Sequence, residues 1–142
     1  MGTERYGERV LDREDCLRHL RRGGTGRVAV TVAALPAIYP VSYDTWDDDV
    51  VFAMIAGTKL VRATLGAVVA FEVDDIETVD HRWSVTVVGL ADEIADSKQL
   101  ARLRALHLAP WVGDTKAVAF LRIRTDLIYG RERTAELSGR AP

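Results

Sequence analysis

The chain has 142 residues and a mass of 15.7 kDa, the size of one domain. Its net charge of −2 and its 28% charged residues exclude the strongly basic surface of a nucleic-acid or anionic-membrane binder. A single cysteine excludes an internal disulfide and a cysteine-ligated zinc site. The apolar runs are too short to span a membrane, and residues 1–10 lack the apolar segment of a signal peptide. We therefore expect one cytoplasmic domain over residues 1–142, with loose ends at 1–10 and 133–142.

The first predicted element is a helix over residues 11–22, capped by Asp12 and ended by a Gly-Gly pair. Runs rich in Val, Ile and aromatic residues then predict strands. These strands cover residues 27–33, 37–45, 50–55, 67–74, 83–95, 117–124 and 127–131. We place Pro36 in or beside the first turn between strands. We also expect a bulge or sharp bend at Gly89, in the middle of the longest strand.

Two further helices are predicted, a short one over residues 59–65 and a longer one over 97–106, capped by Asp96 or Ser97. A polar connection is expected at 75–82. The strands follow one another in hairpin-like succession and do not alternate with long crossover helices. This order favours a mainly β, antiparallel sheet or small barrel over a parallel doubly wound sheet.

Several familiar sites are absent from the sequence. The glycines at 24–26 do not continue into a dinucleotide-binding fingerprint, and there is no phosphate-binding Walker loop or nucleophile elbow. His19, His81 and His107 fall in different predicted elements, so we expect no metal site. The acidic clusters at 47–49 and 74–75 stand at strand ends, where solvated turn residues are the simpler interpretation.

The first candidate site is the start of the short helix. Gly57 lets the backbone approach a ligand closely, and Thr58 and Lys59 follow with a hydroxyl and an ammonium where free N–H groups attract anions. The chain has three lysines against sixteen arginines, so a lysine here is not the default basic residue. This pattern predicts a phosphate site that ends at Leu60. A capped surface helix with a solvated lysine explains it equally well.

The second candidate is the strand segment 39–43, which reads Tyr-Pro-Val-Ser-Tyr. It offers an apolar face and exposed backbone groups against which a flat heteroaromatic ring could lie. An ordinary edge strand of the core is the alternative. The third candidate begins at Trp83. Ser84 and Thr86 share one face of that strand, and Trp83, Val85 and Val87 share the other. The polar side either points inward toward a ligand or outward to solvent.

In their order and spacing, these motifs resemble the pyridoxamine 5′-phosphate oxidase-related family of flavin-binding split barrels, and its small actinobacterial branch in particular. The resemblance covers about residues 11–131. The segments that carry it are the helix at 11–17, Gly-Arg-Val-Ala-Val at 26–30, Pro-Val-Ser-Tyr at 40–43, Val-Phe at 51–52, Gly-Thr-Lys at 57–59, Ala-Phe-Glu-Val-Asp at 70–74, Trp-Ser-Val at 83–85 with Gly89, Arg-Ile-Arg at 122–124 and Ile-Tyr-Gly-Arg at 128–131.

The resemblance implies a six-stranded antiparallel Greek-key split barrel with short flanking helices. It also implies a homodimer with two FMN sites at its interface, acting as an FMN-dependent oxidoreductase on a small-molecule substrate. Thr58 and Lys59 would hold the phosphate, residues 40–43 would run beside the ring, and residues 83–85 would line the ring or ribityl chain. The cofactor-binding residues implied are Pro40, Val41, Ser42, Tyr43, Gly57, Thr58, Lys59, Leu60, Trp83, Ser84 and Val85.

Two departures separate the chain from the enzymes that oxidise pyridoxamine phosphate itself. Those enzymes carry further arginines at the phosphate and a basic C-terminal clamp, whereas Thr58 precedes the lysine here and Arg131 is the nearest C-terminal candidate. A deazaflavin-dependent reductase of the same fold is one alternative. A protein that binds flavin, haem or a lipophilic ligand without turnover is another. His107 and Trp111 could shape a substrate entrance, and the sequence identifies no catalytic residue.

Overall fold

Strands dominate the structure, as their apolar patterns predict. The computed structural model describes residues 8–111 and 117–134. The helices are α1 (Arg13–Leu20), α2 (Lys59–Thr64) and α3 (Ser97–Arg104). The strands are β1 (Glu8–Val10), β2 (Gly24–Val32), β3 (Leu35–Trp46), β4 (Asp49–Ile55), β5 (Val68–Thr78), β6 (His81–Glu93), β7 (Val118–Ile123) and β8 (Leu127–Arg133). The helix and strand order predicted from the sequence is confirmed, with one strand added at the start of the described chain.

Six strands close into a barrel in the order β6, β5, β2, β3, β4, β7, and every pairing is antiparallel. The ring closes where residues 91–93 of β6 pair with residues 121–123 of β7. This confirms the predicted six-stranded antiparallel split barrel. The interior is filled by a single apolar cluster that includes Phe52, Phe71 and Leu121, all fully buried.

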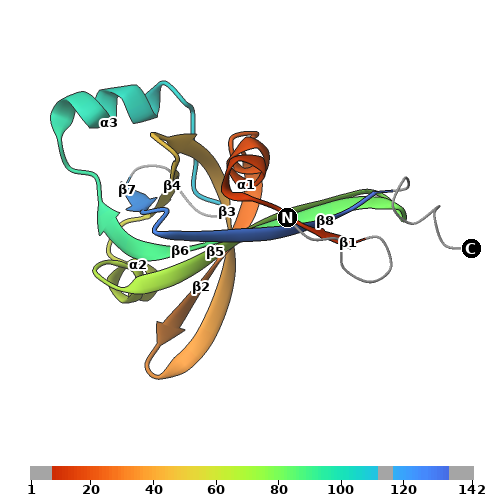
Figure 1. Ribbon diagram of the computed structural model, residues 1–142. Coiled ribbons are helices and arrows are strands. Elements are labelled where there is room, and N and C mark those ends of the chain that lie inside the picture. Colours follow the sequence, from red (N-terminus) through yellow and green to blue (C-terminus); the bar gives the residue numbers. More distant parts are fainter. Residues whose placement is uncertain (1–7, 112–116, 135–142) are drawn as a thin grey trace, which may run out of the picture.

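β6 extends beyond the barrel, so that one end of it closes the barrel and the other end pairs with a strand outside the barrel. Its residues 82–88 pair with β8, and β8 pairs in turn with β1. A ribbon of β5, β6, β8 and β1 therefore extends away from the barrel (Figure 1). Because residues 8–10 form part of this ribbon, the prediction of a loose arm over residues 1–10 is wrong for its last three positions.

Gly89 stands where β6 leaves β8 and joins β7. Of the bulge or sharp bend predicted at Gly89, the bulge is wrong, because the β5–β6 register runs through Gly89 without a break, and the bend stays a prediction. The irregularity in that pair lies between Ile76 and Thr78. A Cβ at position 89 would collide with the carbonyl oxygen of Arg124. Glycine is needed here because the connection from β7 to β8 crosses directly over the strand.

Two hairpins differ in detail from the prediction. The β2–β3 turn is formed by Ala33 and Ala34, both with positive φ (50° and 66°), which is the backbone of a two-residue type I′ turn. Pro36 lies beyond this turn, inside β3 and opposite Thr31. The polar connection predicted over 75–82 is instead a hairpin, because β5 continues to Thr78 and β6 begins at His81.

The helices lie outside the barrel wall. Asp12 caps α1 as predicted, since its side chain accepts from the backbone N–H of Asp15 at 2.8 Å. α3 is capped by Asp96 and covers a second apolar cluster on β4 and β7 through Leu103. Figure 1 shows α3 apart from α1, on the side of the barrel formed by β4 and β7. Among the described residues, no helix is long and apolar enough to span a membrane.

Candidate functional site

β3 and β4 are neighbours in the barrel, but they pair only at one end. Their pairs run from Tyr43–Phe52 to Trp46–Asp49. Beyond Tyr43, β3 remains paired with β2, and β4 remains paired with β7 as far as Ile55. The two strands therefore diverge, and residues 38–42 have no β4 partner in the described part of the chain. The barrel wall opens at this point.

A groove of about 160 Å³ occupies this opening. It brings together two segments that the sequence singled out separately, the strand at 39–43 and the start of α2. Its lining residues, mostly apolar, are Tyr39, Pro40, Val41, Ala53, Met54, Ile55, Thr58, Leu60, Pro110 and Trp111. The groove is thus an apolar slot with backbone and hydroxyl groups at its edges, which suits a flat and largely apolar ligand.

A chain of hydroxyl contacts fixes the Tyr39 side of the groove. The hydroxyl of the fully buried Thr64 donates to the carbonyl of Leu60 at 2.6 Å. Its proton is therefore committed, and Tyr39 is the donor in the 2.9 Å contact between the Tyr39 and Thr64 hydroxyls. Burial raises the pKa of Tyr39, although the Thr64 contact opposes the rise. Tyr39 is consequently a neutral, positioned side chain whose oxygen can still accept a hydrogen bond.

The start of α2 has the geometry that the sequence predicts. Gly57 adopts a positive φ of 79°, and Thr58 caps the helix by accepting from the backbone N–H of Val61 at 3.2 Å. Arg62 reaches back and donates to the Gly57 carbonyl at 2.6 Å. Lys59 is exposed and does not line the groove, but it stands between two residues that do. The structure therefore places the backbone of Lys59 beside the groove.

The strand motif at 39–43 is divided between the groove and the core. Pro40 and Val41 line the groove, and Ser42 is half-buried outside it. Tyr43 is a core residue that is 3% exposed, packs edge-on against Phe71 and donates its hydroxyl to the Leu20 carbonyl at 2.8 Å. The Tyr43 side chain is satisfied inside the barrel and does not reach the groove.

The motif that begins at Trp83 lies elsewhere. The predicted alternation is confirmed, and it is the apolar side that faces inward, so the interpretation of an inward polar side is wrong. Trp83 is 6% exposed and stacks on His19 with ring centroids 4.2 Å apart. Val85 is fully buried, and Ser84 lines a second groove on the β5–β6–β8–β1 ribbon. Within one chain these residues do not meet the β3–β4 groove.

Sequence reasoning missed the β4 side of the groove. Ala53, Met54 and Ile55 end an unbroken apolar run, a pattern that looks the same for a core strand and for a groove wall. Of the two side chains proposed for a substrate entrance, Trp111 lines the groove and is half-exposed. His107 is exposed just after α3 and does not line it.

These features identify the fold as an antiparallel split barrel, and comparison with known proteins agrees. A family model for pyridoxamine 5′-phosphate oxidase matches residues 12–132, and the chain belongs to this family. The matched range includes the whole barrel and the groove.

Three similar proteins illustrate the extent of the similarity in sequence and structure. The chain is 42% identical over 108 residues to the uncharacterized protein Rv0080 of Mycobacterium tuberculosis, which covers 72% of this chain and 70% of that protein. It is 31% identical to the FAD-binding protein of Mycobacterium smegmatis, with a TM-score of 0.74 over 87% of this chain and 98% of that one. A conserved Corynebacterium diphtheriae protein of unknown function is 27% identical, with a TM-score of 0.71 over 90% and 99% of the chains.

Proposed function

We propose that the chain binds a flavin, FMN in the first instance, in the β3–β4 groove and acts as one half of a homodimeric oxidoreductase. The observation that carries the proposal is the convergence of residues 40–41 with the start of α2 on one apolar slot. The similarity to a protein described as FAD-binding supports a flavin without choosing between FMN and FAD. A bound flavin supplies hydride transfer, which the protein side chains cannot perform.

The residues around the groove fit such a ligand. Pro40, Val41 and Leu60 would form the apolar wall along the ring system, and Thr58 would hold the helix start in place. Lys59 would contact the phosphate, because it is exposed beside the groove and has no ion-pair partner among the described residues. Gly57 would let the backbone approach that phosphate closely, since its positive φ turns the chain just before the helix.

The size of the groove supports a site shared between two chains. Small-molecule sites usually enclose about 300–1,000 Å³, and the groove of one chain, at about 160 Å³, is smaller. A second chain would complete it and exclude water. Of the motif at 83–85, only Ser84 would reach the flavin from the partner subunit, because Trp83 and Val85 are buried within their own chain.

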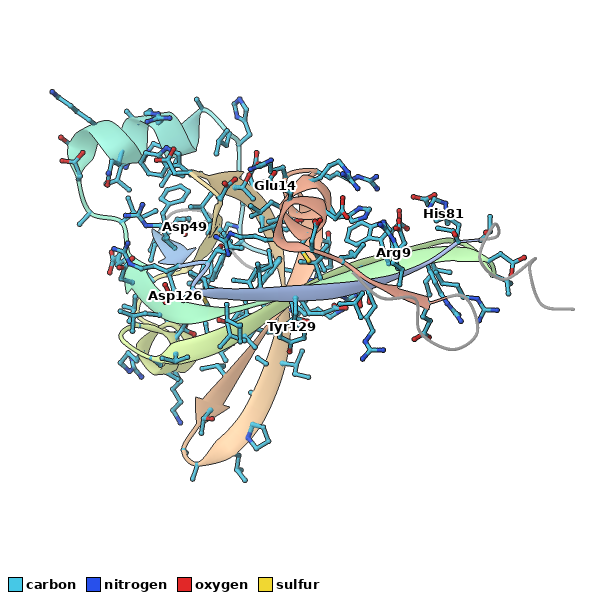
Figure 2. The ribbon with its side chains drawn as sticks, in the orientation of Figure 1. Arg9, Glu14, Asp49, His81, Asp126 and Tyr129 are labelled. Atoms are coloured by element: carbon cyan, nitrogen blue, oxygen red, sulfur yellow. The ribbon has the colours of Figure 1, made fainter. Side chains whose placement is uncertain are left out.

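An apolar surface for that partner lies on the outside of the barrel. One row of residues crosses five adjacent strands on the outer face: Ile38, Ala29, Ala70, Val88 and Leu127. Ile38 and Leu127 are 72% and 55% exposed, and Tyr129 nearby is 53% exposed. Figure 2 shows Tyr129 projecting from β8 on the side away from α1. Continuous exposed apolar surface of this kind is typical of a protein–protein interface.

Titration of the purified protein with FMN, FAD, riboflavin and a deazaflavin cofactor tests the proposal. We expect Lys59→Ala to weaken FMN binding about tenfold or more, since a charge-assisted contact to phosphate is lost. Its affinity for riboflavin, which has no phosphate, should not change. Lys98→Ala is the matched control, because Lys98 is an exposed lysine on α3.

The outcomes separate the alternatives. Equal FMN affinity in the wild type and Lys59→Ala contradicts the phosphate assignment, and an absence of binding to every flavin contradicts the site itself. Preference for the deazaflavin identifies the reductase of the same fold. If flavin binds but NADH or NADPH with an electron acceptor never drives turnover, the chain is a binding protein. Sedimentation of the loaded protein then reports whether two chains form the unit.

A further inference from the structure

A second groove, of about 240 Å³, lies on the ribbon of β5, β6, β8 and β1. It is larger than the β3–β4 groove, and the two grooves share no lining residue. Its charged and polar side chains include Glu8, Asp74, Arg82, Ser84, Arg131 and Arg133. None of these residues belongs to the apolar core of the barrel, since they stand on the part of the sheet that extends beyond it.

Two arginines of this groove face each other. Arg82 on β6 is directly opposite Arg133 on β8 in the strand register. Like charges in directly opposed positions destabilise a sheet. Neither guanidinium has an ion-pair partner among the residues that the structure describes, and the Nε of Arg133 is buried without a hydrogen-bond partner. The strand pair therefore carries a repulsion that the protein itself does not relieve.

The acidic residues of the groove do not neutralise these two charges, because each is already engaged. Glu8 stands opposite Arg133 in the register, but its carboxylate lies 3.4 Å from Arg131. Asp74 lies 3.6 Å from Arg27. The third carboxylate, Glu132, accepts from Arg9 at 2.7 Å. Arg82 and Arg133 therefore contribute positive charge to the groove that no carboxylate in its lining neutralises.

We propose that this groove binds the phosphate group of a small phosphorylated molecule, with Arg82 and Arg133 as its clamp. A guanidinium presents a flat fork of N–H donors that matches phosphate oxygens, and a phosphate monoester carries about −1.5 to −2 charge at pH 7. Two unneutralised arginines balance that charge.

Thermal unfolding in phosphate-free buffer and in rising inorganic phosphate tests the proposal, with chloride at equal ionic strength as the salt control. The wild type should be stabilised by phosphate. In Arg82→Gln the apparent Kd for phosphate should rise about tenfold or more. In phosphate-free buffer the same variant should unfold at the wild-type temperature or higher, because the opposed charges are gone. Arg104→Gln, at an exposed arginine on α3, should behave as the wild type.

Three results would overturn the assignment. The first is equal stabilisation by phosphate in the wild type and Arg82→Gln. The second is a lower unfolding temperature for Arg82→Gln without phosphate, which would show that Arg82 stabilises the ribbon itself. The third is loss of the phosphate effect in Lys59→Ala but not in Arg82→Gln, which would place the anion at α2.

An FMN titration of Arg82→Gln distinguishes the proposed phosphate site from the flavin site. Its FMN affinity should be unchanged, and a weaker affinity would assign these arginines to a partner's flavin and refute a separate site.

Discussion

Leu103→Ala tests how α3 is held to the barrel and how that helix positions the groove. Leu103 is 1% exposed and is the one buried residue of α3, packed in a small cluster with Val51, Ala53, Ile94 and Phe120. Leu→Ala in a core costs roughly 2–5 kcal/mol, depending on how far the neighbours can close the cavity. Because α3 has only this one buried contact residue, it can settle into the space, and we expect the lower part of that range, about 2–3 kcal/mol.

Urea unfolding followed by circular dichroism measures this loss. About 2–3 kcal/mol corresponds to a fall in Tm of roughly 5–10 °C for a domain of this size. The matched control is Leu106→Ala, the same deletion just after α3 at a side chain that is 42% exposed; it should cost less than about 0.5 kcal/mol. Since the chain runs from α3 to Trp111 at the groove, Leu103→Ala should also weaken flavin binding. A loss below about 1 kcal/mol, or equal losses in the two variants, would refute the reasoning.

Two further predictions concern the barrel closure and acid sensitivity. Gly89→Ala places a Cβ against the Arg124 carbonyl, which belongs to the backbone and cannot rotate away, so we expect a loss of about 3 kcal/mol or more in urea unfolding; a variant as stable as the wild type contradicts the crossing geometry. Burial, together with repulsion from Arg22, lowers the pKa of His19. Between its unfolded value near 6.5 and its lower folded value, the unfolded chain binds a proton that the folded chain does not. The free energy of unfolding therefore falls as pH drops below about 7, and it should fall less steeply in His19→Phe; parallel pH profiles for the two proteins would exclude His19 as a source.

The parts of this fold that local chemistry determines could be predicted from the sequence. Asp12 caps α1 because its carboxylate reaches the third N–H along the chain, and Thr58 caps α2 for the same reason. The positive φ of Gly57 can be predicted from the turn alone, because glycine adopts this conformation without a steric cost. The strand alternation at Trp83–Val85 also follows from period two.

The parts that were missed depend on distant segments. Alternation shows that Trp83 and Val85 share a face, but the inward direction is set by α1, whose His19 stacks on Trp83. Position 89 has no room for a side chain because Arg124, in the later connection between β7 and β8, crosses it. No local pattern in residues 8–10 reveals that β8, more than a hundred residues later, pairs with them.

Only one side of the candidate site could be predicted from the sequence, because the other side also depends on how distant strands pair. Thr58 stood out because it follows Gly57 at the start of a predicted helix, and Pro40 because it belongs to a strand segment with aromatic residues at both ends. Met54 did not, because a methionine in a buried run carries no sign that the neighbouring strand has diverged. The groove exists because β3 and β4 part beyond Tyr43, and only the three-dimensional pairing reveals that point.

The closure of the barrel by β7 also bears on how the chain folds during synthesis. β7 pairs with β4 and β6, and its partners in β4 precede it by about seventy residues. Such long-range pairings form late and slowly. Until residues 118–123 leave the ribosome, β4 and β6 present open edges to solvent. Unpaired edges are the places where a nascent chain joins to another chain. The interval before β7 emerges is therefore when this protein is most exposed to aggregation, and when a chaperone would protect it most.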